Sequence, residues 1–225
     1  MWNLPAPPGF QGLREDLPLE VYDQLLPHWR QEGATYFVTF RLGDSLPQSK
    51  LRELRSLRAE WERRHPPPRS RQDLEQISRQ IFTRFERWLD QGFGSCLLKT
   101  AGFAAKVVEQ LEAEDGGNCE LGCYVVMPNH VHAIVRPLRP RERPLQDIVG
   151  AMKGASACGI NQARGASGSL WQRDSYDRII RDEEHLYRII QYIGRNPARS
   201  GLVLDAAPLW IRPEWRDLGW RFETG

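Results

Sequence analysis

The sequence predicts an α+β fold in which helices cover the faces of an antiparallel sheet of about four strands. Three observations carry this prediction. Runs rich in β-branched and aromatic residues alternate with longer segments of helical periodicity, and glycine and proline clusters separate them. The order along the chain is one strand, an inserted pair of helices, and then α, β, β, α, β, α. With 225 residues, the chain has the length of one domain with elaborations. This order of elements fits a ferredoxin-like or RRM-like sheet with helices on its faces.

The N-terminal part of the chain leads into the first strand and an insertion. Residues 1–33 contain five prolines, and we expect this segment to lie extended over the surface or to be partly disordered. Residues 34–42 combine β-branched with aromatic side chains and predict a strand. Residues 47–64 and 73–90 then predict two inserted helices rich in arginine and glutamate. We interpret most of their charges as solvated, salt-bridged faces.

The rest of the chain supplies the remaining strands and helices. An amphipathic helix over residues 101–114 precedes two short apolar strands, which a Met-Pro-Asn turn joins. We expect the tail, where tryptophan and arginine are interleaved, to pack on the domain, with clamping of single-stranded bases as the alternative. The predicted strands are 119–127, 130–137 and 170–180, and the predicted helices are 144–164 and 182–197. The predicted division of the chain is 1–33, a domain over 34–204 with its helical insertion at about 47–90, and the tail 205–225.

Composition limits the class of protein. Twenty-seven of the 31 basic residues are arginine, whose planar guanidinium binds phosphate through two hydrogen bonds and stacks on bases. This excess is compatible with nucleic-acid binding, although a GC-rich coding sequence produces the same bias. The sequence has no compact disulfide pattern, no signal peptide and no apolar stretch of membrane length, so we expect a cytoplasmic protein with reduced thiols. Cys119 and Cys123 lack the second pair of ligands that a structural zinc site needs.

Two histidines stand out in the second of the paired strands. Side chains alternate between the faces of a strand, so His130 and His132 point to one side while Val131 points to the other. The backbone positions of the two histidines are roughly 7 Å apart, which allows both imidazoles to bind one ion. The alternative is a pair of hydrogen-bonded histidines within the sheet.

The last predicted helix carries a polar pair beside its apolar stripe. Tyr192 and Asn196 are one turn apart and lie on the flank of the stripe. By themselves they would be boundary residues with their polar tips in water. Asp182 supplies an N-terminal cap, and Pro197 suits the end of the helix. The stripe has the spacing i, i+3, i+4, i+7 and consists of Leu186, Ile189, Ile190 and Ile193.

Three motifs together resemble a known family. They are Val126-Met127-Pro128-Asn129-His130-Val131-His132, the segment LWQRDSYDR from Leu170 to Arg178, and Tyr192-x-x-x-Asn196-Pro197. They look like the Y1 HUH single-strand transposases of the IS200 type, above all the branch associated with repetitive extragenic palindromes, the REP-associated tyrosine transposases. The resemblance extends from about Tyr36 to Leu202. It implies the HUH nuclease fold, which agrees with the order of elements.

The resemblance implies a metal-dependent single-stranded DNA endonuclease and strand transferase that recognises hairpin-forming REP-type repeats. Tyr192 would be the nucleophile, and its attack would leave a 5′-phosphotyrosine and a free 3′-OH. His130, His132 and Asn196 would hold Mg²⁺ or Mn²⁺, which acts as a Lewis acid on the phosphate. Two imidazoles favour Mn²⁺, because it accepts mixed nitrogen and oxygen ligands. Asn196 departs from the glutamine that many insertion-sequence members have at this position.

Two other tyrosines compete for the role of nucleophile, and one segment departs from the family. Tyr176 lies in the predicted strand 170–180, where packing or stacking on DNA is an ordinary role. Tyr187 has no ligand-like partner one turn further along the helix. The insertion between residues 43 and 95 is longer than in the minimal transposase of this family, and its role is open at this stage.

The expected partner is single-stranded or hairpin DNA, and five basic residues are predicted to bind it. Lys153 is flanked by small residues that let a phosphate backbone approach, although close packing of the helix on the sheet would explain them too. We expect no membrane partner and a monomer in the cytoplasm, associated with the nucleoid, with a homodimer as the alternative. The predicted DNA-binding residues are Lys153, Arg173, Arg178, Arg195 and Arg199.

Two other functions remain open at this point. One is a domesticated protein that binds hairpin DNA without productive cleavage. The other is an RNA-processing nuclease on a similar ferredoxin-like scaffold, which would use histidine as acid and base. Covalent capture of DNA on Tyr192 would separate both from the transposase-like reaction.

Overall fold

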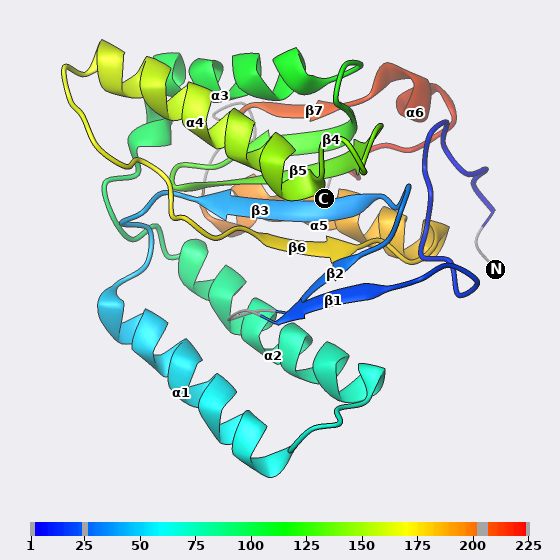
Figure 1. The fold of residues 1–225 in the computed structure, drawn as a ribbon. Coiled ribbons are helices and arrows are strands. Elements are labelled where there is room, and N and C mark those ends of the chain that lie inside the picture. The colour runs from blue at the N-terminus through cyan, green and yellow to red at the C-terminus, as the bar shows by residue number, and fades with distance from the viewer. Residues whose placement is uncertain (1–2, 24–26, 202–206, 224–225) are drawn as a thin grey trace.

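The computed structural model describes residues 3–23, 27–201 and 207–223, and its centre is a five-stranded antiparallel sheet (Figure 1). The predicted α+β class and the four predicted strands are confirmed. The sheet is wider than predicted because a strand from the tail pairs with β4 at one edge. In spatial order the strands are β6 (Tyr176–Ile179), β3 (Tyr36–Arg41), β5 (His130–Pro137), β4 (Cys119–Val126) and β7 (Leu209–Ile211).

Two elements differ in extent from the prediction. The strand expected over residues 170–180 is regular only at β6, because the chain bends after an isolated bridge between Trp171 and Leu42. The last helix continues past Pro197, because proline removes only its own N–H and Ser200 still donates its N–H to the Asn196 carbonyl (3.2 Å). The helices are α1 (Gln48–Arg64), α2 (Arg71–Leu89), α3 (Ala101–Glu114), α4 (Leu145–Ala163), α5 (Glu183–Arg199) and α6 (Pro213–Asp217), with a 3-10 turn at Leu97–Lys99.

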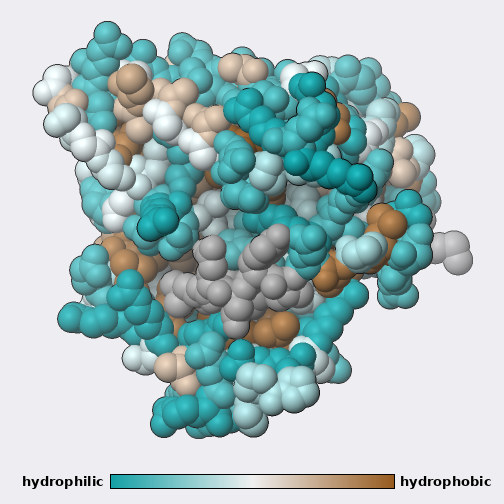
Figure 2. All heavy atoms as spheres, viewed as in Figure 1, coloured by the Kyte–Doolittle hydropathy of each residue, from teal (hydrophilic) through white to brown (hydrophobic). Residues whose placement is uncertain are grey.

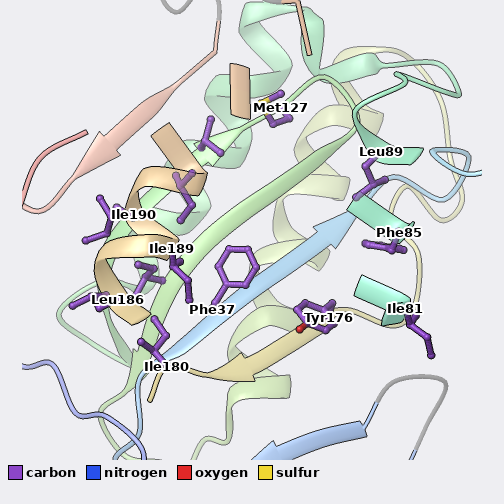
Figure 3. Packing of buried hydrophobic residues seen from close by; sticks show 14 of the residues in the cluster. Phe37, Ile81, Phe85, Leu89, Met127, Tyr176, Ile180, Leu186, Ile189 and Ile190 are labelled. Carbon is purple, nitrogen blue, oxygen red and sulfur yellow. The ribbon is translucent and has the colours of Figure 1, made fainter. Parts of the chain in front are cut away.

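Helices cover both faces of the sheet, because each face carries apolar side chains. Side chains alternate along β5, so Val131 faces one way and His132 the other. Helices α3 and α4 pack on the side of Val131, here called the α3/α4 face, whereas α2 and α5 pack on the opposite side, the α2/α5 face (Figure 1). Figure 3 shows Phe37 of β3 between Ile189 of α5 and Phe85 of α2 on the α2/α5 face.

The inserted helices α1 and α2 form a hairpin that packs on the α2/α5 face. Apolar residues of both helices join the core there, among them Leu54 and Ile81. Many of their charged residues form ion pairs, as the sequence predicts; Arg71 Nε, for example, lies 3.2 Å from Glu75 Oε1. Glu86 differs from these solvated residues, because only 3% of its surface is exposed. The insertion therefore contributes a buried carboxylate to this face.

The two ends of the chain pack against each other. The N-terminal segment, predicted to be extended or partly disordered, contains a hairpin of β1 (Glu20–Asp23) and β2 (Pro27–Arg30). In the tail, the buried Trp215 donates from its Nε1 to the Pro8 carbonyl (3.0 Å), so this part of the tail packs on the domain. The predicted domain boundaries stay a prediction. Residues 1–2, 24–26, 202–206 and 224–225 lie outside the described residues, and with them Leu202 and the predicted boundary at residue 204.

The surface is predominantly polar on the face drawn in Figure 2. Hydrophilic residues cover most of this face, and hydrophobic residues appear there as small separate patches. Among the described residues, no helix combines the length and the apolar character needed to cross a membrane.

Candidate active site

The two histidines of β5 lie side by side on the α2/α5 face, as their spacing predicts. The Nε2 atoms of His130 and His132 are 3.0 Å apart, and both side chains are buried. Burial, and next the neighbouring His132, hold the pKa of His130 well below its ordinary value, whereas the Asn196 carboxamide acts in the opposite direction. His130 is therefore a neutral imidazole that offers a nitrogen lone pair.

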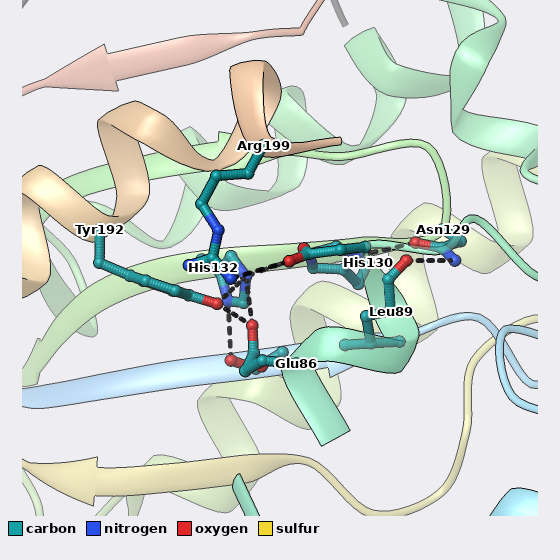
Figure 4. A network of polar contacts seen from close by, with 9 residues as sticks. Glu86, Leu89, Asn129, His130, His132, Tyr192 and Arg199 are labelled. Atoms are coloured by element: carbon teal, nitrogen blue, oxygen red, sulfur yellow. Dashed lines mark hydrogen bonds and ion pairs between the residues drawn. The ribbon is translucent and has the colours of Figure 1, made fainter. Parts of the chain in front are cut away.

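Outer hydrogen bonds orient both rings. Asn129 Oδ1 accepts a hydrogen bond from His130 Nδ1 (2.7 Å; Figure 4), and Thr39 Oγ1 lies 2.8 Å from His132 Nδ1. The Asn129 amide nitrogen donates in turn to the Phe93 carbonyl (3.2 Å). In the tautomer in which each Nδ1 carries the proton, both Nε2 lone pairs face the space between the rings. This arrangement is typical of metal-binding histidines, whose second nitrogen is held by an outer partner.

Glu86 of α2 joins the histidines in a cluster that the sequence did not reveal. Its Oε2 atom is 3.2 Å from His132 Nε2, and the ligand atoms of Glu86, His130 and His132 all lie within 4.8 Å of one another. Its Oε1 atom is buried without a hydrogen-bond partner among the described residues. In the sequence, Glu86 is one of many acidic residues on two charged helices. The available signal is its position one turn after Phe82 and three residues before Leu89, beside the apolar stripe of α2.

Helix α5 brings Tyr192 into this cluster. The Tyr192 hydroxyl donates a hydrogen bond to Glu86 Oε2 and lies 3.5 Å from His132 Nε2 (Figure 4). Burial, and next the charge of Glu86, raise the pKa of the Tyr192 phenol, whereas the Arg199 guanidinium, 5.4 Å from the centre of the ring, lowers it. The phenol therefore needs an acceptor for its proton before it can act as a nucleophile.

Asn196 follows Tyr192 by one turn of α5 and is fully buried. Neither its amide oxygen nor its amide nitrogen makes a hydrogen bond within the described parts of the chain. Such unsatisfied buried atoms are rare in folded proteins, and a bound ion is one reason for them. Helical spacing predicts that Tyr192 and Asn196 lie together on one flank of the helix. In the structure, that flank lies on the same face of the sheet as the histidine pair.

The cluster fits a divalent cation. Nitrogen atoms of His130 and His132 from β5 lie beside a carboxylate oxygen of Glu86 from α2, and the amide of Asn196 from α5 adjoins His130. Two imidazoles with oxygen ligands suit Mn²⁺ and are compatible with Mg²⁺. The group of Glu86, His130 and His132 can therefore bind a divalent metal ion. Within the described residues this is the one such group of three or more ligating side chains, so the cysteine pair at Cys119 lacks further ligands for zinc.

The other candidate tyrosines lie elsewhere. Tyr176 is buried against Phe82, with ring centroids 4.4 Å apart, and burial raises its pKa to about 12. Tyr187 points outward and donates a hydrogen bond to Glu223. Of the three tyrosines considered from the sequence, Tyr192 is the one that contacts the histidine pair.

The basic residues predicted to bind DNA fall in three places, and Lys153 and Arg173 share the first. Lys153 on α4 donates from its Nζ to the Arg173 carbonyl (2.6 Å), and both residues line a groove between α4 and the segment before β6. Burial lowers the pKa of the Lys153 ammonium, and Asp174 opposes this change. The Lys153 ammonium therefore already makes a hydrogen bond within the protein.

The remaining three predicted DNA-binding residues lie on the other side of the sheet. Arg178 of β6 contacts His185 Nε2 in a pocket between α2, β6 and α5. Arg195 and Arg199 line a second pocket beside Tyr192 on the outer side of α5, and each is paired with a carboxylate. The structure thus brings two of the five residues next to the candidate nucleophile.

Comparison with known proteins bears on this site directly. Residues 102–196 match the family described as Transposase IS200 like, and this range contains His130, His132, Tyr192 and Asn196. Over this range, 95 of the 225 residues, the chain is similar to the IS200-like transposases. The IS200-type resemblance of the sequence is thereby confirmed. The match begins after the helical insertion, so Glu86 lies outside it.

Two individual proteins are also similar to the chain. An uncharacterized protein of Haemophilus influenzae (strain ATCC 51907 / DSM 11121 / KW20 / Rd) is 28% identical over 136 residues, which cover 45% of this chain and 76% of that protein. A solved structure of a REP-associated tyrosine transposase bound to a REP hairpin is 17% identical, with a TM-score of 0.38, and the match covers 76% of this chain and 71% of that one.

Proposed function

We propose that the protein is a metal-dependent single-stranded DNA endonuclease and strand transferase that acts on hairpin-forming REP-type repeats. The observation that carries the proposal is the contact of the Tyr192 hydroxyl with Glu86 and His132 at a buried cluster of ligating side chains. A tyrosine beside a metal-binding histidine pair suits cleavage of a phosphodiester through a covalent intermediate. The match of residues 102–196 to the IS200-like transposases supports this chemistry, and the motifs that resemble the REP-associated branch support the hairpin substrate.

In the proposed reaction the Tyr192 oxygen attacks a phosphorus atom of the DNA. A bond forms between Tyr192 and the 5′-phosphate, the bond to the 3′ oxygen breaks, and a 3′-OH is released. The phosphotyrosine retains the energy of the broken phosphodiester, so the same site can rejoin strands without ATP. His130, His132 and Asn196, with Glu86 within reach, would hold Mg²⁺ or Mn²⁺, and the bound ion would offset the phosphate charge as a Lewis acid.

We propose that the DNA lies over the outer side of α5. Arg195 and Arg199 flank Tyr192 there, where they are placed to bind phosphates next to the one that is cleaved. Arg178 lines a pocket with three further arginines and would bind a more distant phosphate, while Lys153 and Arg173 would serve a separate part of the hairpin. We expect a monomer that acts in the cytoplasm in association with the nucleoid, as predicted from the sequence.

The test is covalent capture of DNA. Labelled single-stranded hairpin DNA is incubated with the protein and Mg²⁺ or Mn²⁺, and we expect an adduct that survives a denaturing gel. Tyr192→Phe should reduce the adduct roughly 10³-fold or more, because it removes the attacking oxygen, and should leave hairpin binding unchanged. Tyr176→Phe is the matched control, since it removes another buried hydroxyl on the same face without touching the histidine pair. An adduct that persists in Tyr192→Phe would contradict the assignment.

One observation favours an alternative, in which the protein binds hairpin DNA without cleaving it. His130 and His132 are completely buried, and the Tyr192 hydroxyl is already engaged by Glu86, so a phosphate reaches the cluster only if neighbouring groups move. In that case the unchanged protein and Tyr192→Phe would bind the hairpin equally and neither would form an adduct. Cleavage of RNA without a metal ion would instead indicate an RNA-processing nuclease.

A further inference from the structure

Glu86 of the inserted helix α2 contacts the oxygen atom that reacts in the proposed mechanism. We propose that Glu86 is the proton acceptor for the Tyr192 hydroxyl, which makes the helical insertion part of the catalytic machinery. This inference rests on the proposed function, because it assigns a role within the same reaction. The family match does not supply it, since the match begins at residue 102, after α2 has ended.

The hydrogen bond between the two side chains already has the direction of the proton transfer. Tyr192 donates to Glu86 Oε2, and two other groups lie near enough to be considered as acceptors. His132 Nε2 is 3.5 Å from the hydroxyl, farther than Glu86 Oε2, and it faces His130 Nε2. Asp90 Oδ2 is paired with the Arg199 guanidinium (3.0 Å). Glu86 is therefore the acceptor that the geometry favours.

The surroundings of the carboxylate favour the transfer as well. The rings of Phe37 and Phe82 lie 5.9 Å and 6.3 Å from the Tyr192 ring, centroid to centroid, so aromatic groups pack beside the phenol. Glu86 Oε1 is buried without a hydrogen-bond partner among the described residues, a placement that costs free energy. Acceptance of a proton removes this buried charge. An unsatisfied carboxylate at this position is explained by a role in the reaction.

A second set of contacts holds α2 at the histidine strand. Asn129 Nδ2 donates to the carbonyls of Leu89 (3.4 Å) and Phe93 (3.2 Å), at and just beyond the end of α2, while its Oδ1 accepts from His130. Leu89 is three residues from Glu86 on the same helix, so this amide ties the carboxylate to the position of the imidazoles. Hydrogen bonds that fix the helix position its catalytic side chain more precisely than a loop would.

The proposed step transfers one proton and exchanges one bond at phosphorus for another. The O–H bond of Tyr192 breaks as the proton moves to Glu86 Oε2, and the phenol oxygen forms a bond with phosphorus. The bond between phosphorus and the 3′ oxygen breaks, and the leaving alkoxide takes a proton from water. In the rejoining step the 3′-OH attacks phosphorus and releases its proton to solvent, while the departing Tyr192 oxygen takes its proton back from Glu86.

The experiment compares Glu86→Gln with Glu53→Gln, the same change on α1 of the insertion, where the side chain pairs with Lys50 (3.1 Å) outside the cluster and outside the proposed DNA-binding pockets. Single-turnover adduct formation is measured with hairpin DNA at saturating Mn²⁺, together with the dissociation constants of Mn²⁺ and of the hairpin. We expect Glu86→Gln to slow adduct formation by roughly 10²- to 10⁴-fold, the usual effect of removing a general base. The dissociation constant of the hairpin should be nearly unchanged, because glutamine keeps the shape of the side chain, and saturating Mn²⁺ offsets any weaker binding of the ion. Glu53→Gln should leave all three quantities unchanged.

A second measurement separates proton transfer from metal binding. Fluorotyrosine in place of Tyr192 has a more acidic phenol and depends less on an acceptor, so it should restore part of the rate lost in Glu86→Gln. If Glu86→Gln does not fold, Glu86→Asp provides the same comparison with a shorter carboxylate, with a smaller loss of rate that fluorotyrosine again restores.

Three outcomes are decisive. Adduct formation at the unchanged rate in Glu86→Gln would overturn the inference and leave the proposed function intact. A slow rate that fluorotyrosine does not restore, but that a higher Mn²⁺ concentration does, would show Glu86 to be a metal ligand only and would also overturn it. The absence of any adduct with the unchanged protein would contradict the proposed function, and this inference with it.

Discussion

The two faces of the central sheet bury different kinds of side chain. On the α3/α4 face the sheet and the helices meet through predominantly apolar residues, such as Val131 and Ile148. On the α2/α5 face, apolar residues such as Phe37 surround a polar cluster that includes Glu86 and His132. Burial of polar atoms without full hydrogen bonding costs free energy, so the second face is less stable than an apolar one of the same size would be. The comparison indicates that one face stabilises the fold and the other carries the chemistry.

Both faces depend on the same strands, which makes the register of the sheet important. In β5 the histidines alternate with Val131, and β3 pairs Thr39 directly opposite His132. A slip of one residue would turn both imidazoles into the α3/α4 core and Val131 into the cluster. The pairing of β3 with β5 therefore determines that the histidines meet α5.

The largest effect is expected from truncation of a core residue on each face. Ile148→Ala on the α3/α4 face should lower the free energy of unfolding by about 2–5 kcal/mol, because it leaves a cavity, and should not change Mn²⁺ affinity. Ile189→Ala, one turn before Tyr192 on α5, should cost a similar amount and also weaken Mn²⁺ binding, because α5 positions Asn196. Chemical unfolding and Mn²⁺ titration measure the two quantities. Equal loss of Mn²⁺ affinity in both variants would contradict the claim that only the α2/α5 face carries the metal site.

A smaller effect is expected from an outer hydrogen bond on the α2/α5 face. Thr39→Val removes the oxygen that lies 2.8 Å from His132 Nδ1 but keeps the volume of the side chain. We expect Mn²⁺ to bind roughly 10- to 100-fold more weakly, because the ring loses the partner that orients it. Thr35→Val is the control, since its hydroxyl instead accepts from the Gln11 backbone N–H (3.0 Å). If calorimetric titration gives the same Mn²⁺ affinity for Thr39→Val as for Thr35→Val, the Thr39 hydroxyl does not orient His132 for metal binding.

The effect that is smallest per pH unit concerns the acid stability of the α2/α5 side. Burial, and next the charge of Arg178 and other arginines, lower the pKa of His185 to about 3, against about 6.5 for a free histidine. Below pH 6.5, His185 binds a proton in the unfolded chain but not in the folded protein. The free energy of unfolding therefore falls as the pH falls from about 6.5 towards 3. The slope from this group is at most about 1.4 kcal/mol per pH unit.

Substitution of the titrating group isolates its contribution. His185→Gln keeps a neutral polar side chain, so the difference in unfolding free energy between it and the unchanged protein should shrink steadily as the pH is lowered from 7 to 4. Urea unfolding at each pH gives this difference. A difference that is constant with pH would mean that His185 is accessible to protons in the folded protein.

Local periodicity predicted the residues of the site that lie on regular elements. Alternation along β5 placed His130 and His132 on one side, and helical spacing placed Tyr192 one turn from Asn196, because each pattern depends on only a few neighbouring residues. The strand expected over residues 170–180 was too long, since composition does not reveal where an edge strand bends away from its neighbour. The tail was expected to pack on the domain, but its strand β7 depends on pairing with β4, which lies far away in the sequence.

The sequence alone determined the order of elements from β3 to α5, the apolar stripes and the two polar pairs of the site, because these follow from side-chain spacing within single strands and helices. Only the tertiary structure decided that both pairs share one face and that Glu86 meets them. Glu86 looks like any charged residue of a solvated helix, and its burial depends on how the hairpin of α1 and α2 packs against a sheet whose strands come later in the chain. Contacts over such distances in sequence leave no local pattern, so the carboxylate beside Tyr192 became visible only in the fold.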